Sequence, residues 1–347
     1  MKIYTLVFGA LIACPMQAQT MHDWENHHVL QINREPARAA FTPFSVRKGD
    51  CSMSLDGIWK FRWTPVPGER IIDFYQTDFN DKDWKDFPVP ANWEVNGYGT
   101  PIYVSAGYPF KIDPPRVMGE PKADYTTYKE RNPVGQYRRT FVLPVGWEAD
   151  GQTFLRFEGV MSAFYVWVGY SQGSMEPSEF NITDYLKTGE NQIALEVYRY
   201  SDGSYLEDQD FWRFGGIHRS IHLIHTPDVR MRDYAIRTLP ASAGNYKDFI
   251  LQIDPQFSVY RGMTGKGYTL QGVLKDASGK EIVKLQGEVE EILDLEHKAS
   301  RMNEWYPQRG PRKTGRLSAI IKSPERWTAE TPYLYKLHLT LQNAEGK

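Results

Sequence analysis

The segment Thr188-Gly189-Glu190-Asn191-Gln192-Ile193-Ala194-Leu195-Glu196-Val197-Tyr198 joins a turn-forming stretch to a run containing β-branched and aromatic residues. Gly and Asn favour tight turns, and the run that follows them is typical of a β-strand. Strand-like runs recur at residues 154–158 and 218–225, each close to a turn-forming dipeptide or a proline. The segment and its repeats therefore predict an all-β chain.

Turn dipeptides containing Gly divide the first two thirds of the chain, at Asp56-Gly57, Asn96-Gly97, Asp150-Gly151 and Asp202-Gly203. Each is flanked by apolar or aromatic residues, as expected of short strands joined by turns. No region alternates strands with helices, which excludes a parallel α/β sheet. Two β-sandwiches in tandem are the simplest architecture that fits this pattern.

The best boundary between the two units is Pro227-Asp228. Beyond it the sequence predicts strands over residues 249–253, 268–274, 282–285 and 336–341, with a hairpin loop over 276–280. A weak helical period involves Val289, Ile292, Leu293 and Glu296. Residues 115–135 are polar and contain several Pro and Gly, so they predict a long loop within the first unit.

The composition excludes several classes of protein. The chain has 347 residues, and its 41 Lys+Arg and 43 Asp+Glu give a net charge of −2, so no basic surface for nucleic acid is indicated. Hydrophobic residues make up 41% of the chain, which is enough for folded cores and excludes disorder.

Residues 1–19 resemble a secretory signal peptide. Lys2 precedes an apolar run over residues 3–13 that is too short to span a bilayer, and the region ends at Ala18 or Gln19. Leu11-Ile12-Ala13-Cys14 also resembles a lipoprotein signal, so the alternative is lipidation at Cys14. Both interpretations predict an exported protein, periplasmic or secreted, with no membrane contact beyond that lipid anchor. Either cut leaves Cys51 as the sole unmodified cysteine, so no internal disulfide is expected.

Three short patterns that look functional have simpler interpretations. Residues 169–173 match a nucleophile elbow, but their strand-like surroundings contradict the strand-to-helix turn which that motif needs. His218 and His222 would share one face of a strand and His225 the other, which favours surface or interface histidines over a metal site. Asn181-Ile182-Thr183 is a glycosylation sequon, which is a weak three-residue pattern.

The segment from Ser201 to Arg213 combines carboxylates, amides and aromatic rings within a short loop-like stretch. Saccharides need this mixture, because carboxylates accept hydrogen bonds from neighbouring hydroxyls and aromatic faces cover the C–H face of the ring. A solvated acidic loop, with Tyr205 and Trp212 filling a gap in the core, is the equal alternative.

Tyr200 to Arg213, followed by Gly216-Ile217-His218-Arg219, closely resembles a stretch of glycoside hydrolase family 2 β-galactosidases. Further matching motifs occur in the order of that family, at residues 55–61, 89–94, 101–103, 108–109, 135–141, 157–164, 177–183 and 327–335. The resemblance runs from about Asp23 to Lys347. The form of residues 202–213 favours β-galactosidase over the related β-glucuronidases and β-mannosidases.

The resemblance implies a jelly-roll β-sandwich followed by an immunoglobulin-like β-sandwich. After the signal peptide over residues 1–19, the predicted domains are an extended segment over 20–50, a sugar-binding jelly roll over 51–226 and an incomplete immunoglobulin-like sandwich over 228–347. In the family a catalytic (β/α)₈ barrel follows and carries both catalytic carboxylates. This chain is therefore expected to lack the barrel, to contain no catalytic residue and to be inactive by itself.

The resemblance implies roles for two residues in this chain. Asp210 matches the family aspartate that binds a galactosyl hydroxyl and helps to hold a sodium ion, although one carboxylate is an incomplete site. Ser105 stands where well-known members carry an asparagine that contacts substrate, but a serine is shorter and has no amide. Magnesium belongs to the intact family enzyme and is not expected to bind this chain.

The chain departs from the family pattern after Val168. Members commonly have an Asn-Gly turn and several further residues between Trp-Val and Val-Gly-Tyr, but here Trp167-Val168 runs directly into Gly169-Tyr170. Because antiparallel strands need turn residues, we expect a strained or re-registered strand at this point.

The leading functional hypothesis is the non-catalytic N-terminal portion of a retaining β-galactosidase, which frames the substrate site for terminal β-D-galactosyl residues. Its expected partners are a galactoside in the intact enzyme and the missing barrel or another subunit. One alternative is a stand-alone carbohydrate-binding module, and the other is a structural or interaction scaffold.

Overall fold

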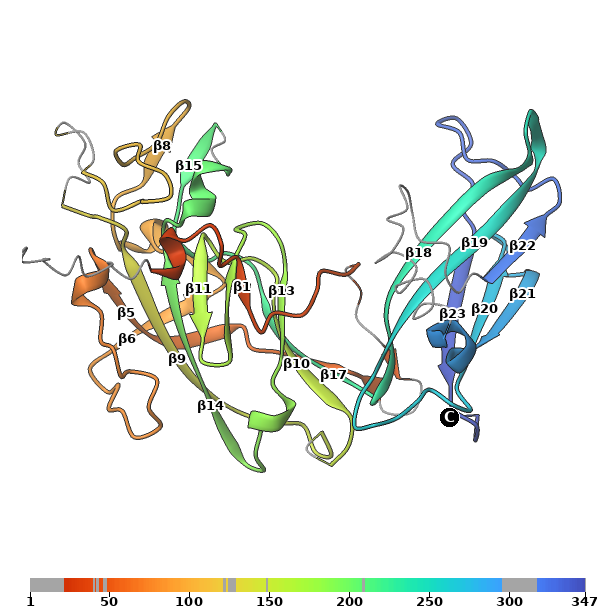
Figure 1. The fold of residues 1–347 in the computed structure, drawn as a ribbon, viewed down its shortest axis with the longest axis horizontal. Helices are drawn as coiled ribbons and strands as arrows, with labels where there is room; N and C mark the ends of the chain where they lie inside the picture. The colour runs from red at the N-terminus through yellow and green to blue at the C-terminus, as the bar shows by residue number, and fades with distance from the viewer. Residues whose placement is uncertain are drawn as a thin grey trace, which may run out of the picture.

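The computed structural model describes residues 22–39, 41, 44–45, 49–120, 123, 129–147, 149–207, 210–294 and 317–346. Within these ranges the chain is nearly all β-structure and forms two bodies that follow each other along the sequence (Figure 1). The predicted fold class, a jelly-roll sandwich followed by an immunoglobulin-like sandwich, is confirmed. The predicted signal peptide lies outside the described residues.

The first sandwich pairs a larger sheet with a smaller one. In the described residues the larger sheet has the strand order β1 (Gln31–Ile32), β12 (Gly169–Gln172), β11 (Ala163–Val166), β14 (Glu190–Tyr198), β9 (Val134–Val142), β5 (Gly57–Thr64) and β6 (Lys85–Val89). The smaller sheet has the order β13 (Ser178–Asn181), β10 (Gln152–Phe157), β17 (Ile221–Thr226) and β4 (Ser52–Ser54). All of these pairs are antiparallel.

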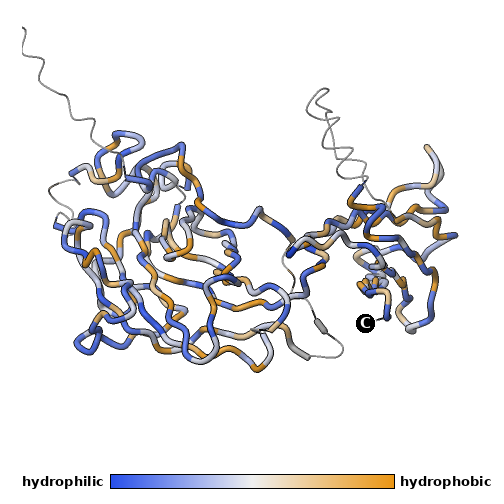
Figure 2. The backbone as a smooth tube through the Cα atoms, turned by 60° about the horizontal axis from the view of Figure 1, so that its bottom comes forward, coloured by the Kyte–Doolittle hydropathy of each residue, from blue (hydrophilic) through white to orange (hydrophobic). Residues whose placement is uncertain are grey.

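Aromatic side chains fill the space between these two sheets. Trp59 and Phe61 of β5 are buried, as are Phe157 of β10 and Phe164 of β11. The rings of Phe157 and Phe164 join the two sheets with centroids 4.7 Å apart. Orange, hydrophobic stretches lie along the chain within both bodies in Figure 2. The high aromatic content of the sequence therefore serves chiefly to build this core.

The second sandwich is smaller and has a more aliphatic core. Its described strands form two sheets. One has the strand order β18 (Val229–Ser242), β19 (Asn245–Val259) and β22 (Leu317–Ile321). The other has the order β21 (Glu281–Glu288), β20 (Thr269–Lys275) and β23 (Lys336–Gln342). Leu251, Ile253 and Leu270 are buried between them. The predicted loop over 276–280 joins β20 to β21, and Asp276 N donates to Lys280 O at 3.0 Å. A helix starts at Val289 and is described to residue 294, in agreement with the weak helical period.

Short ribbons and 3₁₀ turns complete the described chain. The ribbons are β8 (Ile102–Val104) with β15 (Phe211–Arg213), β7 (Ala91–Asn92) with β16 (Gly216–Ile217), and β2 (Phe44–Ser45) with β3 (Gly49–Asp50). The 3₁₀ turns are η1 (Asp23–Glu25), η2 (Pro67–Glu69), η3 (Glu94–Asn96), η4 (Thr183–Tyr185) and η5 (Asp202–Tyr205). In the described part of the chain, no helix combines the length and apolar character needed to cross a bilayer.

Two sequence-based boundaries differ from the structure. The strand predicted over 218–225 begins only at Ile221, as β17, which pairs with β10 and β4, whereas β16 ends at Ile217 and pairs with β7. Residues 218–220 connect these different sheets and so cannot continue either ladder. The loop predicted over 115–135 ends where β9 begins at Val134, and much of its middle lies outside the described residues.

The prediction of a strained or re-registered strand after Val168 is wrong. β11 and β12 pair with Val166 opposite Gly169, so Trp167 and Val168 form a regular two-residue turn. Neither residue has a positive φ. Asn33 Nδ2 donates to Val168 O at 3.0 Å, and the Trp167 ring stacks on Tyr75 with centroids 4.4 Å apart. Contacts from two distant segments therefore stabilise a turn that has no Asn-Gly pair.

Candidate functional site

The ribbon β8–β15 brings both predicted site residues to one place. Phe211 pairs with Val104, and Trp212 pairs with Tyr103. Asp210 immediately precedes β15 and Ser105 immediately follows β8, so the two residues lie at the same end of the ribbon. In Figure 1, β8 and β15 lie side by side at one end of the first sandwich.

The register also determines which side chains share a face of this ribbon. Side chains alternate along a strand, so Tyr103 and Ser105 lie on one face, and Trp212 and Asp210 lie on that same face across the pair. Tyr103 and Trp212 are about half exposed, and their ring centroids are 5.8 Å apart. The face therefore presents a carboxylate, two hydroxyls and two aromatic rings to solvent.

Asp210 has a fixed partner on this face. The Tyr103 hydroxyl donates a hydrogen bond to Asp210 Oδ1, which is the diagonal contact expected between neighbouring strands. This hydrogen bond raises the pKa of Tyr103 above its ordinary value, because ionisation would break the bond and place a second negative charge beside the carboxylate. The pair holds the carboxylate in one orientation while Asp210 stays exposed.

Tyr103 was not predicted as a site residue, and Trp212 was predicted only as one of the aromatic rings in the segment from Ser201 to Arg213, although both residues belong to family motifs. The signal was available in the alternation of Ile102-Tyr103-Val104, which places Tyr103 opposite its two apolar neighbours. The missing information was the pairing partner of β8, since residues 102–104 and 211–213 are more than a hundred positions apart.

A buried charge network supports the base of the ribbon. Arg199 Nε lies 3.1 Å from Glu94 Oε1, and Arg199 Nη2 donates to Arg213 O at 2.6 Å. Gly215 N donates to both carboxylate oxygens of Glu94, at 3.1 and 3.0 Å. Burial raises the pKa of Glu94, and the charge of Arg199 opposes that shift. These contacts fix the chain on the C-terminal side of β15.

The other patterns in the sequence are structural. Ser171 is fully buried in β12 and bonds to Ser178 Oγ at 2.8 Å, so it cannot act as an exposed nucleophile. Asn181 Nδ2 donates to Gln152 Oε1 at 3.0 Å. His225 lies 3.0 Å from Thr153 Oγ1 and stacks on Trp147. Among the described residues no three His, Cys, Asp or Glu side chains are grouped to hold a metal ion.

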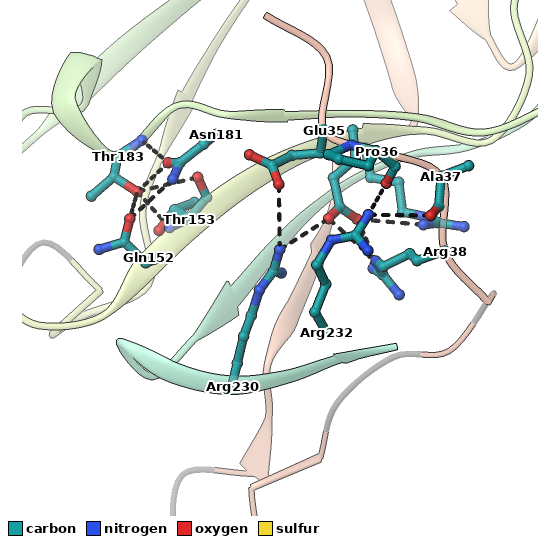
Figure 3. Close-up of polar contacts among 12 residues, drawn as sticks. Glu35, Pro36, Ala37, Arg38, Gln152, Thr153, Asn181, Thr183, Arg230 and Arg232 are labelled. Atoms are coloured by element: carbon teal, nitrogen blue, oxygen red, sulfur yellow. Dashed lines mark hydrogen bonds and ion pairs between the residues drawn. The ribbon is translucent and has the colours of Figure 1, made fainter. Parts of the chain in front are cut away.

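A second charged cluster joins the two sandwiches through the N-terminal segment. Figure 3 shows Glu35 and Arg38 of this segment beside Arg230 of β18. Three arginines converge on the buried Glu179 of β13: Arg38 Nη2 at 2.6 Å, Arg156 Nη1 at 3.4 Å and Arg230 Nη2 at 3.6 Å. This interdomain cluster connects four segments, namely the N-terminal segment, β10, β13 and β18.

The arginines determine the charge state of Glu179. Burial alone would raise the pKa of its carboxyl, but the hydrogen bond from Arg38 and the three positive charges outweigh burial and hold that pKa below its ordinary value. Arg232 Nη2 also donates to the carbonyls of Pro36 and Ala37 in the N-terminal segment. The N-terminal segment therefore connects the first sandwich to the first strand of the second.

Comparison with known proteins gives a consistent family match. Residues 52–227 match the model described as glycosyl hydrolases family 2, sugar binding domain, and residues 229–347 match glycosyl hydrolases family 2. A β-galactosidase of Priestia megaterium is 37% identical over 343 residues, covering 93% of this chain and 30% of that protein. A β-galactosidase of Yersinia enterocolitica is 34% identical over 356 residues, covering 96% of this chain and 31% of that protein. The chain thus spans about a third of the length of these curated relatives.

Solved structures share the fold at lower sequence identity. A calcium-binding mutant of Bacteroides uniformis β-glucuronidase 2 is 22% identical with a TM-score of 0.59, covering 85% of this chain and 31% of that one. A β-glucuronidase from an uncultured Clostridium is 17% identical with a TM-score of 0.57, covering 88% of this chain and 45% of that one. At this level of identity, these likenesses extend to the fold alone.

Proposed function

Because the chain belongs to glycoside hydrolase family 2, and covers the family's N-terminal non-catalytic domains, we propose that it frames the substrate site of a retaining β-galactosidase. In this proposal the two sandwiches hydrolyse nothing themselves. The ribbon β8–β15 forms part of the rim over a catalytic domain that supplies both carboxylates of the retaining reaction.

The observation that supports this role is the shared face of Asp210, Ser105, Tyr103 and Trp212. A carboxylate accepts hydrogen bonds from two neighbouring sugar hydroxyls, and an exposed aromatic ring covers an apolar sugar face. The hydrogen bond from Tyr103 fixes Asp210 before a ligand arrives, which lowers the entropy cost of binding. A galactosyl residue held at this rim would be oriented by the ribbon and cleaved elsewhere.

The ions fit the same division of roles. Asp210 supplies a hard oxygen ligand suited to sodium, but one carboxylate needs further oxygen ligands from the catalytic domain or from water. Magnesium would belong to that catalytic domain. We also propose export, by plain secretion or as a lipoprotein through Cys14, on the basis of residues 1–19.

The first test uses the purified chain with a chromogenic β-galactoside. We expect no turnover above a blank, because the proposal places both reacting carboxylates outside this polypeptide. Turnover that copurifies with the chain would contradict the proposal.

A chimera tests the role of the ribbon. This chain replaces the matching third of the Priestia megaterium β-galactosidase, and hydrolysis of lactose is measured. We expect an active chimera in which Asp210→Asn lowers kcat/KM by about 10²-fold, because a polar contact to the substrate is lost. Asp86→Asn, an exposed carboxylate on β6, serves as the matched control and should leave activity unchanged. An Asp210→Asn chimera with full activity would exclude the ribbon from the substrate site.

A further inference from the structure

A second candidate binding surface lies on the larger sheet of the first sandwich. The turn between β11 and β12, the loop before β6 and the N-terminal segment enclose a groove with a cavity volume of about 680 Å³. Small-molecule sites commonly have volumes of about 300–1,000 Å³. We call it the aromatic groove, and its principal lining residues are Asn33, Arg70, Tyr75, Trp167, Tyr185 and Glu196.

Fixed aromatic rings form the rim of the aromatic groove. Trp167 stacks on Tyr75 with ring planes 21° apart. The buried Phe74 packs edge-on against Trp167, with ring centroids 4.8 Å apart. Trp167 and Tyr75 are each 40% exposed, and Tyr185 is 67% exposed. The Trp167 ring is therefore held in one orientation by its neighbours while part of its surface faces the solvent.

Polar groups form the floor of the aromatic groove. Arg70 Nε lies 3.1 Å from Glu196 Oε1, and Gln136 Nε2 donates to Glu196 Oε2 at 2.9 Å. Arg70 Nη1 donates to Pro67 O at 2.8 Å, whereas Nη2 has no hydrogen-bond partner among the described residues. Asn33 donates to the turn through Nδ2, and its side-chain oxygen has no hydrogen-bond partner among the described residues. The floor thus offers a donor and an acceptor beside the rings.

The charges of the aromatic groove disfavour an anionic ligand. Arg70 is paired with Glu196, and Asp23, which also lines the groove, accepts a hydrogen bond from Tyr165 at 2.7 Å. No second arginine or lysine lines it among the described residues. A phosphate or an acidic chain would meet two carboxyl groups and one neutralised cation, whereas a purely apolar ligand would strip water from the polar floor.

We propose that the aromatic groove binds a neutral saccharide, with an apolar sugar face against the exposed part of the stacked Trp167–Tyr75 pair and hydroxyls toward Arg70 and Asn33. A sugar ring combines an apolar C–H face with hydroxyls that donate and accept, which matches aromatic rings beside a polar floor. None of the ribbon residues Tyr103, Ser105, Asp210 and Trp212 lines this groove. The proposed site is therefore separate from the ribbon, and does not depend on the role proposed for it.

The test measures binding of neutral disaccharides to the full chain by calorimetry and saturation-transfer NMR. The probes are lactose, β-1,4-galactobiose, cellobiose and xylobiose, with the anionic digalacturonic acid as a comparison. We expect at least one neutral probe to bind with Kd of about 1 mM or tighter, and digalacturonic acid to bind more weakly. Saturation should transfer most strongly to the protons on one sugar face.

Variants assign that binding to the groove. Trp167→Ala should weaken binding about tenfold, and Trp167→Phe should restore part of it, because a ring face remains. Since Trp167→Ala removes contacts to Tyr75 and Phe74, Tyr185→Ala provides a second variant at a highly exposed side chain. It should weaken binding several-fold without changing the melting temperature. Tyr246→Ala on β19, a similarly exposed tyrosine outside both the aromatic groove and the ribbon, is the matched control and should bind like the unmodified chain.

Three results would overturn the proposal. The first is no binding of any neutral probe at about 10 mM, ten times the expected Kd. The second is unchanged affinity in both Trp167→Ala and Tyr185→Ala. The third is loss of binding in Asp210→Asn or Trp212→Ala, which would place the saccharide on the ribbon. The chimera's activity is independent of all three, so failure here is distinguishable from failure of the substrate-rim function.

Discussion

The two sandwiches of this chain differ in what fills them. The first contains a dense aromatic core in which Trp59, Trp93 and Phe157 are buried to 1% exposure or less. The second relies on aliphatic side chains such as Leu251 and Leu270. On β21 every residue is exposed or half-buried, whereas on β10 every residue is buried. Most of the hydrophobic stabilisation, and both candidate binding surfaces, therefore belong to the first sandwich.

The difference shows that the two sandwiches contribute unequally to the candidate binding surfaces. Sites need side chains held in place by packing, and the first sandwich supplies that beneath both the ribbon and the aromatic groove. In the second sandwich burial alternates from residue to residue, as along β20, and neither candidate surface lies on it. Substitutions placed in each body, and between them, test this division.

The largest effect is expected in the two cores. Phe157→Ala should lower the free energy of unfolding by about 3–5 kcal/mol, because it leaves a cavity between the sheets of the first sandwich. Leu270→Ala should cost about 2–5 kcal/mol and act on the second sandwich. Urea denaturation with hydrogen exchange measures both. Faster exchange throughout β9 and β14 in Leu270→Ala would show that the two bodies do not unfold separately.

A slightly smaller effect is expected at the interdomain cluster. Glu179→Gln should cost about 3 kcal/mol, because Arg38, Arg156 and Arg230 lose the charge that compensates them in a buried place. The control is Glu281→Gln on β21, whose partner Lys284 is exposed, and which should leave the stability nearly unchanged. Equal effects from the two variants would refute a special role for the cluster.

The same carboxylate gives the cluster a pH dependence. The pKa of Glu179 is lowered in the folded chain, so its stabilisation is complete above the ordinary glutamate value of 4.5. It is lost as the pH falls from that value through the lower folded pKa. Urea midpoints measured from about pH 6 to about pH 3 should fall more steeply for the unmodified chain than for Glu179→Gln. Parallel curves would contradict this assignment.

The next effect concerns the turn between β11 and β12. A Cβ at Gly169 would lie 2.3 Å from Ile32 O and 2.8 Å from the Phe180 ring, so Gly169→Ala should cost about 1–3 kcal/mol by overpacking. Gly68→Ala, where a Cβ meets nothing within 4 Å, is the matched control and should be nearly neutral. Thermal melting distinguishes the two, and a neutral Gly169→Ala would mean that β1 moves away easily.

The smallest effect is expected on the ribbon. Tyr103→Phe should leave the free energy of unfolding nearly unchanged, because the side chain is about half exposed. A spectroscopic titration should lose one tyrosine that ionises above the ordinary pKa, since Asp210 raises the pKa of Tyr103. An unchanged titration curve would show that the hydrogen bond to Asp210 does not persist in solution.

The sequence predicts the β-runs well because period and turn chemistry are local properties. Residues 154–157 and 193–198, and the loop after Lys275, lie where the pattern places them. The start of the strand predicted at His218 was placed three residues too early, because residues 218–220 connect β16 to β17, which pair with different distant strands. The turn at Trp167-Val168 was predicted wrongly for the same reason, since Asn33 and Tyr75 stabilise it from elsewhere in the chain.

The candidate site shows the same limit. Asp210 and Ser105 were identified through motifs of the family, and the ribbon register places them together. Tyr103 and Trp212 could not be joined to them without knowing that β8 pairs with β15. The aromatic groove was not predicted at all, because its rim and floor come from five separated stretches of chain.

The pairing of β8 with β15 carries a consequence for synthesis on the ribosome. The two halves of the ribbon are translated more than a hundred codons apart, and β9 to β14 must emerge between them. A nascent chain that has released Tyr103 therefore cannot yet orient an aspartate beside it. The ribbon can form only after Arg213 has left the exit tunnel. Any product that terminates earlier contains β8 without β15 and cannot place Tyr103 beside Asp210.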